Sequence, residues 1–286
     1  MKKKPNMKKI IFFLNLILAF QLTDLFSQDR LLTLGELQKT KLYKSIDEAL
    51  NEPGKVFRIN LSNAGLTSLP SEIFLLKNLQ SVNLSNNPLT DLPQNIKIFK
   101  NLQYLNIEGT NIVNLPAELS DLKNLVSLNL DKMSMLNSMN AMNTIFSLEN
   151  LKELSMNSVY IMSVPPQIRK LKNLAKLRLS GCGIAEISKE IGSLRNLKYA
   201  DLSFNEISAI PSQTGNMISM EELYLGGNQI KSLPEEIRKL AGSLQILGLA
   251  ATDNSTGEYV NNPITKEKVS EIQEWLPNTK IIYIFN

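Results

Sequence analysis

The sequence contains no histidine, one cysteine (Cys182) and one tryptophan, and only 6% of its 286 residues are aromatic. Without histidine and with a single cysteine, one chain cannot form a disulfide framework, a Cys/His metal site or a histidine-dependent catalytic triad. We therefore predict no metal, no cofactor and no enzymatic activity. Hydrophobic residues still make up 43% of the chain, so the core is expected to consist mainly of aliphatic side chains.

The chain also lacks a general basic field, although its formal net charge is +4. Residues 1–27 contain five lysines and one acidic residue, which leaves 26 basic and 26 acidic residues in the remainder. A balanced body does not attract a polyanion over its whole surface. We therefore predict no nucleic-acid partner.

No apolar run is long enough to cross a membrane comfortably as a helix. Lysine-rich residues 1–9 precede the short apolar run Ile10–Phe20, and polar residues follow. This layout is typical of a secretory signal peptide, so we predict one over residues 1–27, with cleavage after Ser27. Leu25 is a poor fit to the small-residue rule at such a site. An uncleaved N-terminal anchor and a cytosolic protein with a chance apolar start remain the alternatives.

The rest of the sequence is dominated by a repeat, which extends from Val56 to about Thr252. It reads L-x-x-L-x-L-x-x-N-x-L-x-x-L-P-x-x-I-x-x-L-x-N. One clear copy contains Leu79, Val82, Leu84, Asn87, Leu89, Leu92, Pro93, Ile96, Phe99 and Asn101. Nine copies begin at Val56, Leu79, Leu102, Leu125, Leu151, Leu174, Leu197, Met220 and Leu244. Their period of about 23 residues falls within the range of 20–29 residues that is the signature of leucine-rich repeats.

The repeat resembles that of bacterial exported leucine-rich repeat proteins. The resemblance implies an α/β solenoid, shaped like a horseshoe, with about nine repeats and a parallel sheet on its concave side. The L-x-L alternation predicts one short strand in each repeat. The L-P-x-x-I-x-x-L half predicts a short helical or 3₁₀ return segment, with an inward-facing stripe such as Leu92, Ile96 and Phe99. We divide the chain into a signal peptide (1–27), an N-terminal cap (28–55), repeats (56–252) and a C-terminal cap (253–286).

Both caps and one irregular repeat have their own signals. Ser45 and Glu48 have the spacing of a capping box, which predicts a short helix in the N-terminal cap. After a polar loop over Thr252–Asn262, we expect a helix over about Lys266–Leu276 and a strand over Lys280–Phe285. Val269, Ile272 and Leu276 form the apolar stripe of this helix. The fourth repeat is longer than the others and has no Leu-Pro step, so we predict a bulge on the convex side around 133–147.

The ninth position of each repeat is expected to satisfy buried backbone groups with a polar side chain. It carries Asn87, Asn205 and Asn228, with small substitutes at Thr110, Cys182 and Thr252; Ala64, Met133 and Val159 depart from the pattern. Cys182 is therefore interpreted as structural, because no histidine could activate it as a nucleophile. Asn60, Asn83, Asn106 and Asn129 occupy an outward strand position, where we expect a structural ladder of stacked amides.

The later repeats carry more varied residues on the concave face, where aromatic and charged side chains mix as they do in protein-binding hot spots. We predict a partner-binding patch formed by Lys176, Arg178, Tyr199, Asp201, Phe204, Glu222 and Tyr224; ordinary surface variation is the alternative. The expected function is binding of another protein, in adhesion or host interaction, by an exported protein at the cell surface, in the medium or in the periplasm. The repeat type also resembles intracellular Ras-group signalling scaffolds, and a structural envelope protein or a glycan-binding protein stays open.

Overall fold

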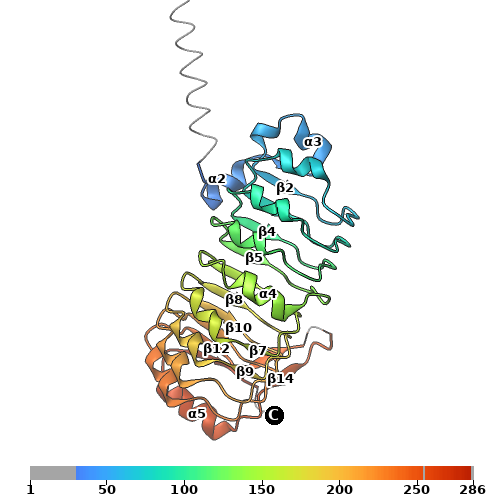
Figure 1. Cartoon of the computed structure of the whole chain (residues 1–286). Coiled ribbons are helices and arrows are strands. Elements are labelled where there is room, and N and C mark those ends of the chain that lie inside the picture. The colour runs from blue at the N-terminus through green and yellow to red at the C-terminus, as the bar shows by residue number, and fades with distance from the viewer. Residues whose placement is uncertain (1–29, 254, 285–286) are drawn as a thin grey trace, which may run out of the picture.

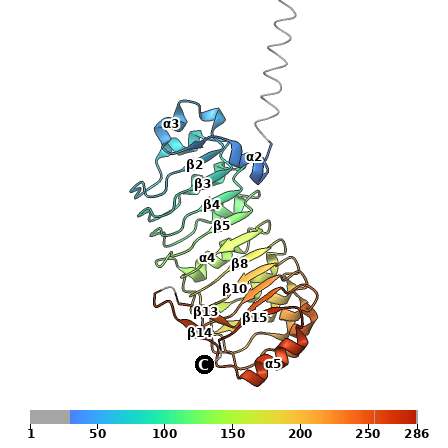
Figure 2. The ribbon, with the colours of Figure 1, turned by 180° about the vertical axis from the view of Figure 1, so that it is seen from behind.

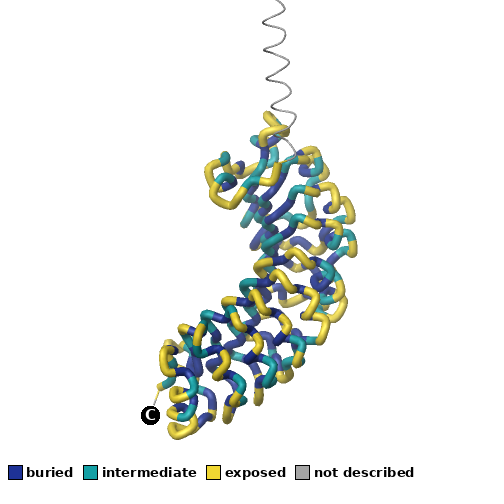
Figure 3. The backbone as a smooth tube through the Cα atoms, turned by 90° about the vertical axis from the view of Figure 1, so that its left-hand side faces the viewer, coloured by how far each residue is buried: buried dark blue, intermediate teal, exposed yellow. Residues whose placement is uncertain are grey.

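The computed structural model describes residues 30–253 and 255–284, which form a curved solenoid around one parallel sheet (Figures 1 and 3). The predicted signal peptide lies outside the described residues. The nine repeats each contribute one strand, as predicted: β2 (Arg58–Asn60), β3 (Ser81–Asn83), β4 (Tyr104–Asn106), β5 (Ser127–Asn129), β6 (Glu153–Ser155), β8 (Lys176–Arg178), β10 (Tyr199–Asp201), β11 (Glu222–Tyr224) and β12 (Ile246–Gly248).

The strands stack in strict register, which follows from the period of the repeat. Val82 in β3 lies opposite Leu105 in β4, and Leu105 lies opposite Leu128 in β5. These central residues point into the core and are buried, whereas the residues before and after them in each strand are partly exposed on the concave face of the sheet. Because side chains alternate along a strand, the same two positions of every repeat face the concave side.

Short 3₁₀ segments return the chain along the convex side in most repeats. They are η2 (Ser71–Leu75), η3 (Gln94–Ile98), η4 (Ala117–Asp121), η5 (Pro166–Lys170), η6 (Lys189–Ser193), η7 (Ser212–Asn216) and η8 (Glu235–Leu240). Most of them follow the proline of the Leu-Pro step, such as Pro93 before η3. The predicted stripe of Leu92, Ile96 and Phe99 is buried.

The irregular fourth repeat replaces its 3₁₀ segment with a true α-helix, α4 (Ser138–Ile145). The helix lies where the bulge was predicted. Asn137 caps it by accepting a hydrogen bond from the backbone amide of Asn140. Between this repeat and η6, the two-residue strands β7 (Ser163–Val164) and β9 (Glu186–Ile187) form a small second sheet.

The N-terminal cap contains α2 (Leu34–Lys39), β1 (Leu42–Tyr43), α3 (Ile46–Leu50) and the 3₁₀ segment η1 (Pro53–Lys55). The predicted capping box of α3 is only half formed. Ser45 accepts from the Glu48 amide, but the Glu48 carboxylate accepts from the Lys44 amide instead of reaching back to Ser45. The sequence analysis missed both α2 and β1. Since β1 pairs with β2, it covers the edge that the first repeat would otherwise expose.

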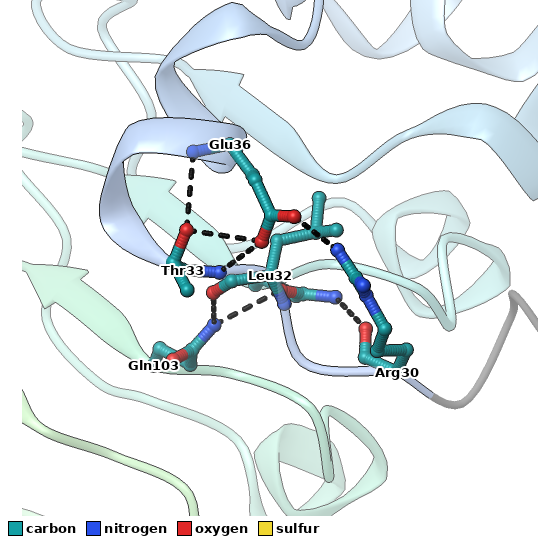
Figure 4. A network of polar contacts seen from close by, with 6 residues as sticks. Arg30, Leu32, Thr33, Glu36 and Gln103 are labelled. Atoms are coloured by element: carbon teal, nitrogen blue, oxygen red, sulfur yellow. Dashed lines mark hydrogen bonds and ion pairs between the residues drawn. The ribbon is translucent and has the colours of Figure 1, made fainter.

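Two buried glutamines fasten the start of this cap to the side of the repeats. Gln80 accepts from the Leu32 amide at 2.8 Å and donates to the Arg30 carbonyl at 3.0 Å. Gln103 donates to the Leu32 carbonyl at 2.9 Å (Figure 4). Next to them, Thr33 and Glu36 form a complete capping box for α2. The segment 30–33 is thus held through its backbone.

The C-terminal cap consists of α5 (Lys266–Trp275) and β15 (Lys280–Ile282), which pairs with β12. Val269, Ile272 and Leu276 are buried as predicted. The predicted polar loop at 252–262 was wrong, because this segment forms most of a hairpin of β13 (Ala250–Thr252) and β14 (Tyr259–Asn261). Figure 2 shows the hairpin beside the C-terminal part of the sheet. Within the described residues, every helix is too short or too polar to cross a membrane.

Buried asparagines connect successive turns of the solenoid. The Asn205 side chain donates to the carbonyls of Leu179 and Leu202 at 2.8 and 2.9 Å and accepts from the amides of Cys182 and Ile184 at 2.8 and 3.1 Å. Asn87 and Asn228 make corresponding bonds. In the ninth repeat, the prediction that Thr252 satisfies the buried backbone groups was wrong. Thr252 belongs to β13 of the hairpin, and Asn262 takes the buried position instead. Its side chain donates to the Leu225 and Leu249 carbonyls and accepts from the Ile230 amide.

The outward asparagines are structural, but they do not form the expected stack of amides. Asn60, Asn83, Asn106 and Asn129 each accept a hydrogen bond from the backbone amide two residues later. Where Ser155 and Arg178 replace asparagine, the neighbouring repeat supplies the acceptor. Asp131 accepts from the Asn157 amide, and Asn157 accepts from the Ser180 amide.

We predict that Asn205→Ala lowers the free energy of unfolding by at least about 2 kcal/mol, because it leaves several buried backbone groups without partners. Urea unfolding followed by circular dichroism measures this change. Asn196→Ala is the matched control, since the Asn196 side chain makes one exposed bond to the Lys172 carbonyl. Equal losses in the two variants would contradict the structural role assigned to the buried amide.

Candidate functional site

The strands β8, β10 and β11 bring the predicted binding residues onto one face of the sheet. One row across the strands contains Lys176, Tyr199 and Glu222, and the adjacent row contains Arg178, Asp201 and Tyr224. Phe204 follows β10 in the loop at the end of the strand. All seven side chains are partly exposed. We call these residues the concave patch: Lys176, Arg178, Tyr199, Asp201, Phe204, Glu222 and Tyr224.

Aromatic and charged groups contact one another within the concave patch. The Tyr199 and Tyr224 rings lie 5.6 Å apart, centroid to centroid, at an interplanar angle of 47°. The Lys176 ammonium lies 5.3 Å from the Tyr199 ring centroid and the Arg178 guanidinium 5.2 Å from it, both within the range of cation–π contacts. The Tyr224 hydroxyl donates to the Glu222 carboxylate at 2.7 Å. These contacts link the two rings to each other and to charged side chains of β8 and β11.

Burial and neighbouring carboxylates raise the pKa of both tyrosines. Desolvation is the larger cause at Tyr199, followed by the charge of Asp201. At Tyr224, desolvation is followed by the hydrogen bond to Glu222. Since the unperturbed phenol already titrates near pH 10, both side chains stay neutral hydrogen-bond donors at physiological pH. Burial also raises the pKa of the Cys182 thiol to about 11, which keeps it protonated and unreactive.

Phe204 has a backbone conformation that is unusual for a large side chain. Its φ angle is 55°, in the left-handed region, and the equivalent position of other repeats carries Asn63, Asn86, Gly109, Lys132, Ser158, Gly181 and Gly227 with similar φ angles. Asparagine and glycine adopt this conformation readily, whereas a bulky residue does so at a cost of about 1 kcal/mol. Strain of this kind clusters at functional sites.

Glycines in the next repeat make room for the aromatic rings. A Cβ atom on Gly227 would lie 2.8 Å from Cδ1 of Phe204, and one on Gly248 would lie 2.7 Å from Cδ1 of Tyr224. Both rings therefore lie close to the backbone of the following repeat, where any larger residue would displace them.

Four residues of the concave patch line a cleft of about 430 Å³, which we call the aromatic cleft. They are Tyr199, Asp201, Phe204 and Tyr224; Lys176, Arg178 and Glu222 are not part of its lining. Other walls come from residues that the sequence analysis did not select: Ser180, Ser203, Ala250, Ala251, Thr252, Tyr259 and Ile282. Tyr259 belongs to β14 and is 57% exposed. Its segment contains strand-forming residues, but only the pairing of β14 with β13 brings it to the cleft.

A second, more polar cleft of about 490 Å³ adjoins the first and shares Ser180, Asp201 and Phe204 with it. We call it the acidic cleft, because its lining includes the carboxylates of Glu108, Asp131, Asp201 and Asp253. Lys132 is the basic residue of this lining, and its ammonium pairs with Glu108 at 2.7 Å. Asp131 and Asp253 make no ion pair within the part of the chain that the structure describes.

The described residues hold no group of three or more Cys, Asp or Glu side chains arranged to bind a metal ion. The concave patch presents neutral hydroxyl donors, aromatic faces and both signs of charge.

These features define a leucine-rich repeat solenoid with aromatic and charged side chains on its concave side. A family model described as "Leucine-rich repeat region" matches residues 135–241, and one described as "Leucine Rich Repeat" matches residues 78–97. Together with the fold, these matches support a leucine-rich repeat protein. No curated protein sequence matches the chain.

Among solved structures, the chain is similar to a leucine-rich repeat protein from Leptospira interrogans, with 33% identity and a TM-score of 0.68. That match covers 85% of this chain and 64% of the Leptospira chain, so this chain spans slightly less than two thirds of that relative. An internalin from Listeria monocytogenes gives 19% identity and a TM-score of 0.70, over 87% of this chain and 68% of its own. An Arabidopsis receptor kinase, solved in complex with a peptide hormone and a co-receptor, gives 26% identity and a TM-score of 0.54, over 66% of this chain and 33% of its own.

We predict that Phe204→Asn changes the free energy of unfolding by less than about 1 kcal/mol, because relief of the left-handed strain offsets the lost ring contacts. Tyr224→Asn is the matched control, which loses a similar ring without any relief of strain, and it should be the less stable variant by about 1–2 kcal/mol. Urea unfolding compares the two. If Phe204→Asn were as destabilised as Tyr224→Asn, Phe204 would not be a strained residue.

Proposed function

We propose that this protein is exported and non-enzymatic, and that it binds another protein through the concave patch. The observation that carries the proposal is the group of partly exposed aromatic rings in the aromatic cleft. Aromatic residues are enriched in the hot spots of protein interfaces, where they bury large areas at low entropic cost. The leucine-rich repeat fold supports this proposal in general terms, since such solenoids present extended concave binding surfaces.

Adhesion or interaction with a host is the setting that the resemblance to bacterial exported leucine-rich repeat proteins implies. The charge pattern of residues 1–27 supports export. A cytosolic signalling scaffold of the Ras-group type is the alternative if the chain is not exported. A structural envelope protein is the alternative if the concave patch captures no partner.

We predict that replacing Tyr199, Phe204 and Tyr224 together with alanine abolishes partner capture but leaves the solenoid folded. A photo-crosslinking residue at position 222, in protein expressed in its native cells or added to a host cell surface, would report capture as a crosslinked band. Excess purified wild-type protein should compete with that band, and the triple variant should not. The matched control replaces Met139, Tyr160 and Met162, which are exposed outside the concave patch, with serine. Undiminished competition by the triple variant would contradict a role for the concave patch.

We predict that the mature protein begins near Gln28 and is found in a surface or secreted fraction. Mass spectrometry of the native N-terminus and protease treatment of intact cells measure this directly. An intact Met1 or Met7 in the cytosol would contradict export and would favour the intracellular scaffold.

A further inference from the structure

The hairpin β13–β14 lies beside the part of the concave face that carries the predicted binding residues, and it lines one cleft together with them. Ala250, Ala251, Thr252 and Tyr259 form one wall of the aromatic cleft, and Tyr199, Phe204 and Tyr224 line it from the sheet and the loop after β10. Backbone hydrogen bonds hold the hairpin in this position: Gly227 donates to the Val260 carbonyl at 3.1 Å, and Asn262 donates to the Leu249 carbonyl at 3.1 Å. The volume of the aromatic cleft, about 430 Å³, accommodates one large side chain with its adjoining backbone.

The acidic cleft continues from the aromatic cleft along the ends of the strands, because both are lined by Ser180, Asp201 and Phe204. The carboxylates in it already accept hydrogen bonds within the chain. Asp131 accepts from Ser155 and Asn157, and Asp253 accepts from Ser255 and Thr256. Such bonds to neutral donors hold the carboxylates in position without neutralising their charge. Hydrogen bonds to Ser255 and Thr256 also lower the pKa of Asp253, so it is ionised at physiological pH.

The basic groups nearby are engaged or lie outside the acidic cleft. Lys132 pairs with Glu108, and Arg178 lies beside Asp201 on the neighbouring strand with its guanidinium against the Tyr199 ring. The lining therefore has an excess of negative charge, contributed by Asp131 and Asp253. A cationic side chain is the complementary occupant.

We propose that the two adjoining clefts bind a single extended segment of the protein partner, with a large apolar or aromatic side chain in the aromatic cleft and a lysine or arginine in the acidic cleft. This inference rests on the proposed function, because it specifies the partner of the same face. Tyr259 and Asp253, both contributed by the hairpin segment, become recognition residues. A segment that presents acidic side chains or phosphates to the acidic cleft is disfavoured by charge.

The spacing of the strands also sets the spacing of the two side chains in the partner. Asp131 follows β5 and Phe204 follows β10, which are three strands apart in the order β5-β6-β8-β10. Neighbouring strands are about 4.8 Å apart, which makes the separation roughly 14 Å, or about four residues of extended chain. The basic residue is therefore expected about four positions from the apolar one.

A random 12-residue peptide library displayed on phage and selected on the purified protein tests this proposal. We expect enrichment of peptides with Lys or Arg about four positions from Trp, Phe or Leu. Fluorescence anisotropy then measures the affinity of labelled synthetic peptides from the selection. Changing the basic residue of a peptide to Glu should weaken binding at least about tenfold.

Variants of the protein locate the binding site of the selected peptides. Asp253→Asn keeps an oxygen that accepts the turn hydrogen bonds, and it should weaken binding about fivefold at low salt and less at high salt. Tyr259→Ala should weaken binding about fivefold or more at any salt concentration. Asp121→Asn, in η4 on the convex side, is the matched control and should have no effect.

Enriched peptides without a basic residue, peptides that bind Asp253→Asn and Tyr259→Ala as tightly as wild type, or no enrichment at all would each overturn the proposal. The crosslinking experiment with the triple aromatic variant decides the proposed function separately. A partner captured through the concave patch, together with any of these negative peptide results, would show that the partner binds there as a folded surface.

Discussion

The structure depends on hydrogen bonds to the buried backbone groups at the point where each repeat turns away from the sheet. The strands pair with one another, but the buried carbonyls and amides at the following turn have no ladder partner. Asn87, Asn205, Asn228 and Asn262 provide these bonds, each linking its own turn to the preceding repeat. Since an unpaired buried backbone group costs free energy comparable to a lost hydrogen bond, this requirement keeps the turn geometry the same wherever the asparagine is present. Thr110 and Cys182 satisfy fewer groups at the same position.

At both ends of the solenoid, additional elements pair the backbone groups of the outermost strands and cover the core. β1 and β15 add one strand at each edge of the sheet, and α5 covers the last turn of the core with Val269, Ile272 and Leu276. An uncovered edge would leave backbone groups free to pair with another chain. Gln80 and Gln103 add a second fastening at the N-terminal end by bonding to the backbone of residues 30–32.

The candidate binding surface lies where the regular pattern of the outer strand positions ends. In the first repeats, asparagines such as Asn83 cap the end of their own strand and leave little room for variation. From Ser155 onward, Asp131 and Asn157 take over part of this role across neighbouring repeats. Arg178 is therefore not needed as an acceptor and contacts the Tyr199 ring instead. Asp201 keeps the structural role, because its carboxylate accepts from the Ser203 amide, whereas Tyr224 contacts Tyr199 and Glu222. The concave patch thus combines one strand-capping residue with side chains that do not have this structural role.

The sequence alone determined the solenoid, its nine strands and the face on which Lys176, Tyr199 and Tyr224 lie, because a nearly constant period places equivalent positions side by side. It also predicted α5 from the spacing of Val269, Ile272 and Leu276. Only the tertiary structure decided the hairpin β13–β14, since its short strands are stabilised by pairing with each other and by contact with Gly227, not by local pattern. Because of the same non-local packing, Asn262 and not Thr252 bonds to the buried backbone groups of the ninth repeat. The packing also brings Tyr259 and Asp253 to clefts lined by residues far away in the sequence. Inside the repeats, the local sequence pattern is sufficient to predict the structure because the same pattern recurs in every turn. The hairpin β13–β14 does not follow the repeat pattern, so its position depends on its tertiary contacts.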